Sequence, residues 1–247
     1  MGNQLNKKLD NQLQLFKAYR KKKLLQENLN KQLIEASKDG NLSQVKSLII
    51  EGADIHDWED CALNEAAHSG HLEVVKYLVE DCEANVHPDD ECTLRWAAEG
   101  GHLEIVKYLV SKGANVHVGG NEALRKAVWK GHLDVVKYLV SKGANVHAHN
   151  ELALSMAAEG GHLEVVKYLV EDCDADVHVK NEKALHWAKI KKRLDVVKYL
   201  KTYKLSQFTK KHIDKQNLRY VFQQYELPFE IKQIISSYVL NKVRTDH

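Results

Sequence analysis

One pattern of apolar and polar positions recurs along the middle of the chain. The phrase GHLEVVKYLV occurs at residues 70–79 and 161–170, with near copies at 101–110 and 131–140. The first leucine of this sequence recurs every 30 or 31 residues, at Leu42, Leu72, Leu103, Leu133, Leu163 and Leu194. A fixed period of this length is typical of a stacked-repeat architecture.

Each copy contains two apolar patterns at helical spacing. The first part carries a leucine and, three residues later, an alanine, as at Leu63 and Ala66, which is the spacing of one helix face. The second part carries leucine, valine and leucine at i, i+3 and i+6 and predicts a second helix. A glycine such as Gly70 stands between the two, where it takes a left-handed conformation without steric cost. The predicted repeats span 24–53, 54–84, 85–114, 115–144, 145–175 and 176–205.

The predicted repeats must stack in order to fold. One repeat buries about four large apolar side chains, worth roughly 6–12 kcal/mol. Ordering its backbone costs roughly 1 kcal/mol for each of its residues. The balance is unfavourable for a single repeat, so its exposed face must become the core of its neighbour.

The segments AAEGGHLEIVKYLVSKGANVH and AAEGGHLEVVKYLV resemble the ankyrin repeat, over residues 24–205. The usual Thr-Pro-Leu-His opening of the first helix is replaced by CALN, CTLR, EALR, LALS and KALH, and each copy is about three residues short, in its hairpin. Such short repeats are similar to the ankyrin arrays of amoeba-infecting giant viruses (mimivirus-like), which predicts a viral origin. The resemblance implies an all-α repeat solenoid of about six helix-turn-helix repeats with helical caps.

The composition excludes several classes of protein. Two prolines, 13 glycines and 44% apolar residues do not fit a disordered or collagen-like chain. No apolar run is long enough for a transmembrane helix, and four cysteines form no disulfide framework. We therefore expect a monomer in the cytoplasm, the host cytoplasm if the protein is viral, with the nucleus as the alternative.

Charge is distributed in three parts. Residues 1–35 hold eight Lys or Arg against three Asp or Glu, residues 198–247 hold ten against four, and residues 36–197 hold 18 against 27. An acidic centre repels a phosphate backbone, so the repeats are not expected to bind nucleic acid. Only the basic ends leave that alternative open.

Positions that vary between copies indicate where a partner binds. All four tryptophans lie at such positions, in the hairpins or on the first helices away from the Leu/Ala face. Exposed Trp beside Arg is typical of binding hot spots, so we expect a protein-binding groove on the concave side. The alternative is that each Trp packs over the next repeat. The predicted contact residues are Trp58, Arg95, Trp96, Arg125, Lys126, Trp129, Met156, His186 and Trp187.

The histidines and cysteines do not indicate a metal or cofactor. Nine of the 14 histidines are copies of repeat positions, and equivalent atoms in stacked repeats lie roughly 8–10 Å apart, whereas a Zn–N bond needs about 2 Å. Cys61 and Cys92 align in consecutive hairpins, which permits a disulfide as a minor alternative. The sequence also lacks the motifs of hydrolases, zinc proteases, P-loops and dinucleotide sites. We therefore expect a protein that is not an enzyme and holds no cofactor.

Segment 1–23 predicts a basic amphipathic helix. Leu5, Leu9, Leu13 and Phe16 form one stripe, followed by the basic run 20–23. We expect this helix to cap the first repeat. Membrane-surface binding or nuclear targeting by the basic run is the alternative.

Segment 206–247 departs from the repeat. Its sequence LPFEIKQIISSYVL resembles the opening helix of an F-box and the truncated F-box-like tail with which poxviral ankyrin proteins bind the adaptor subunit of cullin ubiquitin ligases. The alternative is a helical cap on the solenoid. The residues that the resemblance assigns to the ligase adaptor are Leu227, Pro228, Ile231, Ile234 and Ile235.

Overall fold

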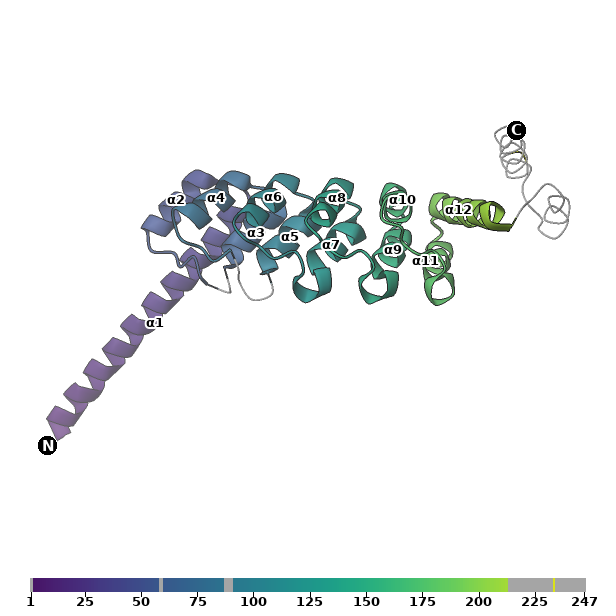
Figure 1. Cartoon of the computed structure of the whole chain (residues 1–247). Helices are drawn as coiled ribbons and strands as arrows, with labels where there is room; N and C mark the ends of the chain where they lie inside the picture. The colour runs from purple at the N-terminus through teal and green to yellow at the C-terminus, as the bar shows by residue number, and fades with distance from the viewer. Residues whose placement is uncertain (1, 58–59, 87–90, 213–232, 234–247) are drawn as a thin grey trace. The chain divides into compact units, whose positions relative to one another are not determined.

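The computed structural model describes residues 2–57, 60–86, 91–212 and 233, and in these ranges the regular structure is α-helical with no β-strand (Figure 1). Contacts divide the chain into two compact units, Met1–His149 and Asn150–His247. The helices are α1 (Gly2–Lys38), α2 (Leu42–Ile50), α3 (Cys61–Ser69), α4 (Leu72–Glu80), α5 (Cys92–Gly100), α6 (Leu103–Ser111), α7 (Val118–Lys130), α8 (Leu133–Ser141), α9 (Ala148–Gly160), α10 (Leu163–Glu171), α11 (Val179–Ile190) and α12 (Leu194–His212).

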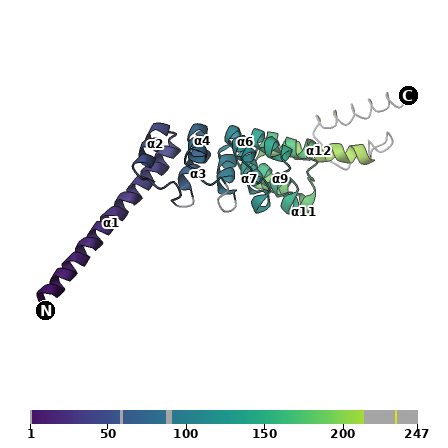
Figure 2. The same ribbon diagram turned by 60° about the vertical axis from the view of Figure 1, so that its left-hand side comes forward.

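The N-terminal unit stacks two rows of helices. The first helices of successive repeats pack in the order α1, α3, α5 and α7, and the second helices α2, α4, α6 and α8 form the other row (Figures 1 and 2). In the C-terminal unit, α12 packs against both α10 and α11. The all-α repeat solenoid predicted from the sequence is confirmed.

The buried columns explain why these helices pair. The predicted leucines and alanines of the first helices are buried, for example Leu94 at 1% and Ala97 at 0% exposure. The leucines that open the second helices lie at the edge of this core: they are only half-buried in α4 and α6, and Leu194 is 77% exposed. That position lies about 100° around the helix from the buried stripe. The column that fills the core instead is Val74, Ile105, Val135, Val165 and Val196.

In three repeats of the N-terminal unit, a histidine side chain contacts the preceding repeat. In the N-terminal unit, the ring Nε2 of His71, His102 and His132 lies 2.8, 2.8 and 2.9 Å from the carbonyl oxygens of Lys38, His68 and Glu99, respectively. These carbonyls end the first helix of the preceding repeat, where no intrahelical partner exists. In the C-terminal unit, Arg193 replaces the histidine and its Nε donates to the Glu159 carbonyl at 3.1 Å.

The short connections before the first helices are left-handed turns. In α7, Gly119, Gly120 and Asn121 have φ of 59°, 63° and 64°, so the regular helix begins only after them. The Asn121 side chain is buried and its Oδ1 accepts from the Asn145 amide at 3.0 Å. Glu91, at φ 55°, accepts from the Asn115 amide in the same way at 3.1 Å. A buried polar side chain thus fastens each of these turns to the next repeat.

The N-terminal segment forms one helix with the first repeat. α1 continues from Gly2 to Lys38 without a break at the expected boundary after residue 23. Its C-terminal part packs against α2 and α3, but Leu13 and Phe16 are 50% and 62% exposed and therefore cover no repeat. In the part of the chain that the structure describes, no helix has both the length and the apolar character needed to cross a membrane.

Candidate partner-binding face

The candidate face of the N-terminal unit consists of first-helix side chains that point away from the Leu/Ala core. Two and five positions after the buried leucine, α5 carries Trp96 and Glu99, and α7 carries Lys126 and Trp129. Positions i and i+3 lie on the same side of a helix, and α5 packs directly against α7. The two helices therefore present one continuous face, called here the α5–α7 face: Arg95, Trp96, Glu99, Glu122, Arg125, Lys126, Trp129 and Lys130.

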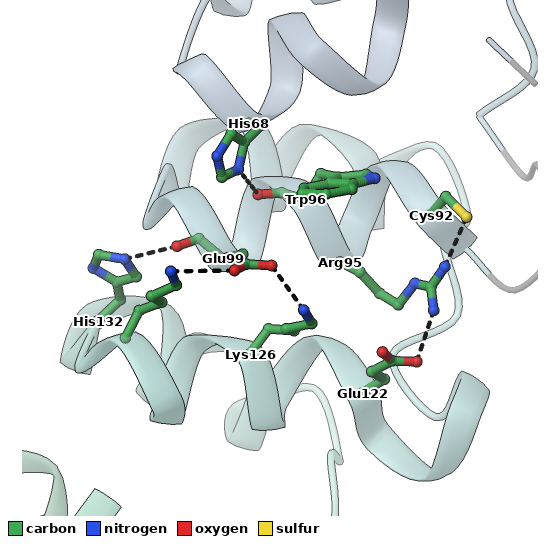
Figure 3. Close-up of polar contacts among 9 residues, drawn as sticks. His68, Cys92, Arg95, Trp96, Glu99, Glu122, Lys126 and His132 are labelled. Atoms are coloured by element: carbon green, nitrogen blue, oxygen red, sulfur yellow. Dashed lines mark hydrogen bonds and ion pairs between the residues drawn. The ribbon is translucent and has the colours of Figure 1, made fainter. Parts of the chain in front are cut away.

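The two tryptophans of this face are partly exposed. Trp96 is 41% and Trp129 is 40% exposed. The ring of Trp96 meets that of His68 edge to face at 5.1 Å between centroids, and His68 Nδ1 lies 3.4 Å from the Trp96 carbonyl oxygen (Figure 3). Trp96 therefore packs against the preceding repeat with one part of its ring and leaves another part accessible to a partner.

Arg95 is held between two repeats. Its Nη1 donates to Glu122 Oε2 at 2.7 Å, and its Nη2 donates to Cys92 Sγ at 2.7 Å (Figure 3). The side chains of Arg95 and Glu122 are only 25% and 27% exposed. The guanidinium is therefore fixed in one position rather than free to follow a ligand.

Glu99 joins two lysines of the next repeat. Its Oε2 lies 2.9 Å from Lys126 Nζ and its Oε1 lies 3.3 Å from Lys130 Nζ, while its side chain is 15% exposed. Burial alone would raise the pKa of the Glu99 carboxyl, but the hydrogen bonds from both lysines outweigh burial and hold the pKa below its usual range. Four cations and two carboxylates meet on this face, since Arg125 also lies here and its Nη1 donates to the Gly120 carbonyl.

The predicted contact residues of the C-terminal unit form a separate set. Met156 and Trp187 are half-buried and His186 is exposed, with 5.9 Å between the ring centroids of His186 and Trp187. Beside them, Ile190 is 53% exposed and Lys191 pairs with Glu159 at 3.2 Å. Trp58 lies outside the described residues, as do the ligase-adaptor residues Leu227, Pro228, Ile231, Ile234 and Ile235.

The carboxylates Glu99 and Glu122 were not among the predicted contact residues. The signal that finds them is charge in neighbouring copies: Glu99 precedes Lys126 by 27 residues and Arg95 precedes Glu122 by 27. Opposite charges almost one repeat apart indicate ion pairs across the repeat interface. Arg95 and Lys126 therefore have a structural role in addition to any contact with a partner.

The described cysteines and histidines form neither a disulfide nor a cluster of metal ligands. Cys61, Cys82, Cys92 and Cys173 are free thiols, so no disulfide joins Cys61 to Cys92. Over the described ranges, no group of three or more His, Cys, Asp or Glu side chains is placed to hold a metal ion.

A comparison with protein families matches the chain to a family model described as ankyrin repeats (3 copies), over residues 33–119, 82–150 and 124–212. Together these matches cover most of the chain and all of the residues on the α5–α7 face. No curated protein matches the sequence.

Proposed function

Because this chain belongs to the ankyrin-repeat family, whose members generally mediate protein–protein interactions, we propose that it is a non-enzymatic scaffold that binds a protein partner on its first-helix face. In the N-terminal unit the binding site is the α5–α7 face. In the C-terminal unit it is the group of Met156, His186 and Trp187.

The observation that carries this proposal is the pair of exposed tryptophans beside charges that are already fixed. Trp96 and Trp129 each leave about 40% of their surface accessible. Arg95 and Lys126 are held by Glu122 and Glu99 before any partner arrives. A partner that binds aromatic anchors in such a rigid setting loses little side-chain entropy on this side of the interface, which favours affinity.

Proximity labelling in the source cell, comparing the full chain with Trp96→Ala/Trp129→Ala, tests this proposal. We expect the double variant to lose the partners that the wild type captures, since truncating a hot-spot aromatic costs about 2 kcal/mol or more. Ile50→Ala is the matched control, because it also removes an exposed apolar side chain, 85% exposed, but outside the face. An unchanged set of partners for the tryptophan variant would contradict the assignment.

Recruitment of a cullin-type ubiquitin ligase through the tail is the second candidate function. It is supported by the sequence LPFEIKQII and rests on resemblance alone. The test is co-purification of a cullin adaptor with the full chain and with a variant that lacks residues 225–247. Loss of the adaptor on deletion, with the partners of the first-helix face retained, supports a substrate-receptor role. Equal recovery of adaptor with both chains contradicts it.

A further inference from the structure

The N-terminal part of α1 exposes a group of large apolar side chains. Six of them, between residues 12 and 25, are at least half exposed: Leu13 50%, Leu15 70%, Phe16 62%, Tyr19 67%, Leu24 58% and Leu25 59%. Most exposed apolar side chains on a soluble protein are scattered singly, whereas a contiguous group marks an interaction site.

Three of these side chains share one face of the helix. At 100° per residue, Leu13, Phe16 and Leu24 fall within a sector of about 80°. Phe16 and Leu24 also line one shallow cavity of about 320 Å³ with Tyr19, Arg20, Lys23 and Glu27. We call Leu13, Phe16 and Leu24 the α1 stripe.

The α1 stripe is not an extension of the surface that packs on the repeats. Leu33 and Ala36, which are 1% and 2% exposed, carry that packing. They lie on the opposite half of the helix, at least about 100° from every residue of the stripe. Figures 1 and 2 show the N-terminal part of α1 extending away from α2 and α3 in both views. The stripe therefore has no partner within the N-terminal unit.

Positive charge surrounds the stripe. Lys17 and Arg20–Lys23 place five cations within seven residues, and no carboxylate occurs between Asp10 and Glu27. One of the five, Lys23, lies 3.9 Å from Glu27, with both side chains more than half exposed. Such an exposed pair neutralises little of the field, so the segment remains strongly basic.

We propose that residues 12–25 of α1 bind the surface of an anionic lipid bilayer, with the α1 stripe inserted among the acyl chains and the cations at the phosphates. An apolar stripe combined with basic flanks is the pattern of an interfacial helix. Arg20 lies inside the stripe, and its long side chain reaches the headgroups while its methylenes stay with the apolar side chains. This surface shares no residue with the α5–α7 face, so it is independent of the partner bound there.

Three other occupants fit the observations less well. A second copy of α1 would bring five cations against five, which repel. A nucleic acid would pair with the cations but leave the apolar stripe in water. An acidic groove of another protein would contact one face of the helix and leave the cations on the other faces unpaired, whereas headgroups lie along both sides of an interfacial helix.

Co-sedimentation of the full chain with vesicles tests the proposal. We expect binding to vesicles rich in phosphatidylserine and not to vesicles of phosphatidylcholine alone. Phe16→Glu/Leu24→Glu should abolish binding. Lys21→Gln/Lys22→Gln should weaken it by about fivefold for each cation removed. Raising the salt from about 0.1 to about 1 M should weaken wild-type binding, because the Debye length falls from about 10 to about 3 Å.

Ile50→Glu is the control for an added carboxylate, since it replaces an exposed apolar side chain of α2 by Glu outside the stripe and should bind as the wild type does. Far-ultraviolet circular dichroism verifies that each variant keeps its helices. Undiminished vesicle binding by Phe16→Glu/Leu24→Glu would overturn the proposal. So would binding of single-stranded RNA without binding of anionic vesicles, or a dimer in solution that Phe16→Glu/Leu24→Glu dissociates.

Discussion

The Nε2 atom of His102 lies 2.8 Å from the carbonyl oxygen of His68, 34 residues earlier in the chain. His102 stands before α6, and His68 lies in the last turn of α3. One side chain thus satisfies a helix-terminal carbonyl of the neighbouring repeat and sets the spacing between the two repeats. The same contact recurs at His71 and His132.

Removal of this contact should lower stability. We expect His102→Ala to decrease the free energy of unfolding by about 1 kcal/mol, because the carbonyl of His68 loses its donor. Urea denaturation followed by circular dichroism measures the change. Lys107→Ala serves as the control, since it removes only an exposed i, i+3 ion pair with Glu104 and should cost about 0.2–0.5 kcal/mol. Equal effects of the two substitutions would contradict a role for His102 in joining the repeats.

Gly101 should tolerate no side chain. Its φ is +79°, and an added Cβ would lie 2.4 Å from Nδ1 of His132. Gly52 has a φ of +99° but nothing within 4 Å of its added Cβ. Both alanine substitutions should cost about 1–2 kcal/mol for the left-handed backbone, and Gly101→Ala should cost more because of the clash.

Thermal unfolding of Gly101→Ala and Gly52→Ala measures the difference. Adding His132→Ala to Gly101→Ala should recover part of the loss, because it removes the ring that the new methyl group meets. If the losses of the two single variants simply add in the double variant, the ring of His132 is not what the new methyl group meets.

Stability should fall as the pH drops below about 6.5 because of His102. Burial lowers the pKa of His102 from its ordinary 6.5, and this outweighs the hydrogen bond to the carbonyl of His68, which raises it. The unfolded chain therefore takes up this proton first as the pH falls, so the unfolding equilibrium shifts toward the unfolded state. The stability that neutral His102 contributes is fully present above about pH 6.5. It is lost as the pH falls from about 6.5 through the lower pKa of His102 in the folded state. The urea midpoint of the wild type should fall more steeply between about pH 7 and pH 5 than that of His102→Gln.

Glu99 should affect the pH dependence of stability at a lower pH than His102 does. Lys126 and Lys130 hold the pKa of the Glu99 carboxyl below the ordinary 4.5. In the folded chain this carboxyl therefore stays ionised at pH values where it is protonated in the unfolded chain. Its stabilisation is present above about 4.5 and is lost as the pH falls through the lower pKa of the folded state. Glu99→Gln should cost about 1 kcal/mol at pH 7 and little at pH 3. Glu73→Gln is the control, since Glu73 pairs with a single lysine, Lys76, and its side chain is 73% exposed. This substitution should change stability less than Glu99→Gln does.

The local pattern of the sequence predicts much of this fold and less of the candidate face. Leu94 and Ala97 are one helical turn apart, so their spacing alone shows that they share a buried face. Trp96 and Trp129 lie at positions whose residues vary between the copies, and both are exposed. The pattern does not separate the leucines that open the second helices from the buried column, because an apolar residue at the edge of a stripe looks the same in a sequence as one at its centre.

What the sequence by itself determined is the repeat, its two helices and the side of each first helix that enters the core, because these depend on residues within one or two helical turns. The tertiary structure decided which residues of one repeat meet those of the next. The contacts of His102 with His68, of Glu99 with Lys126, and of Glu91 with the Asn115 amide join positions 34, 27 and 24 residues apart. Their geometry follows from the register in which whole helices stack, and no local periodicity sets that register.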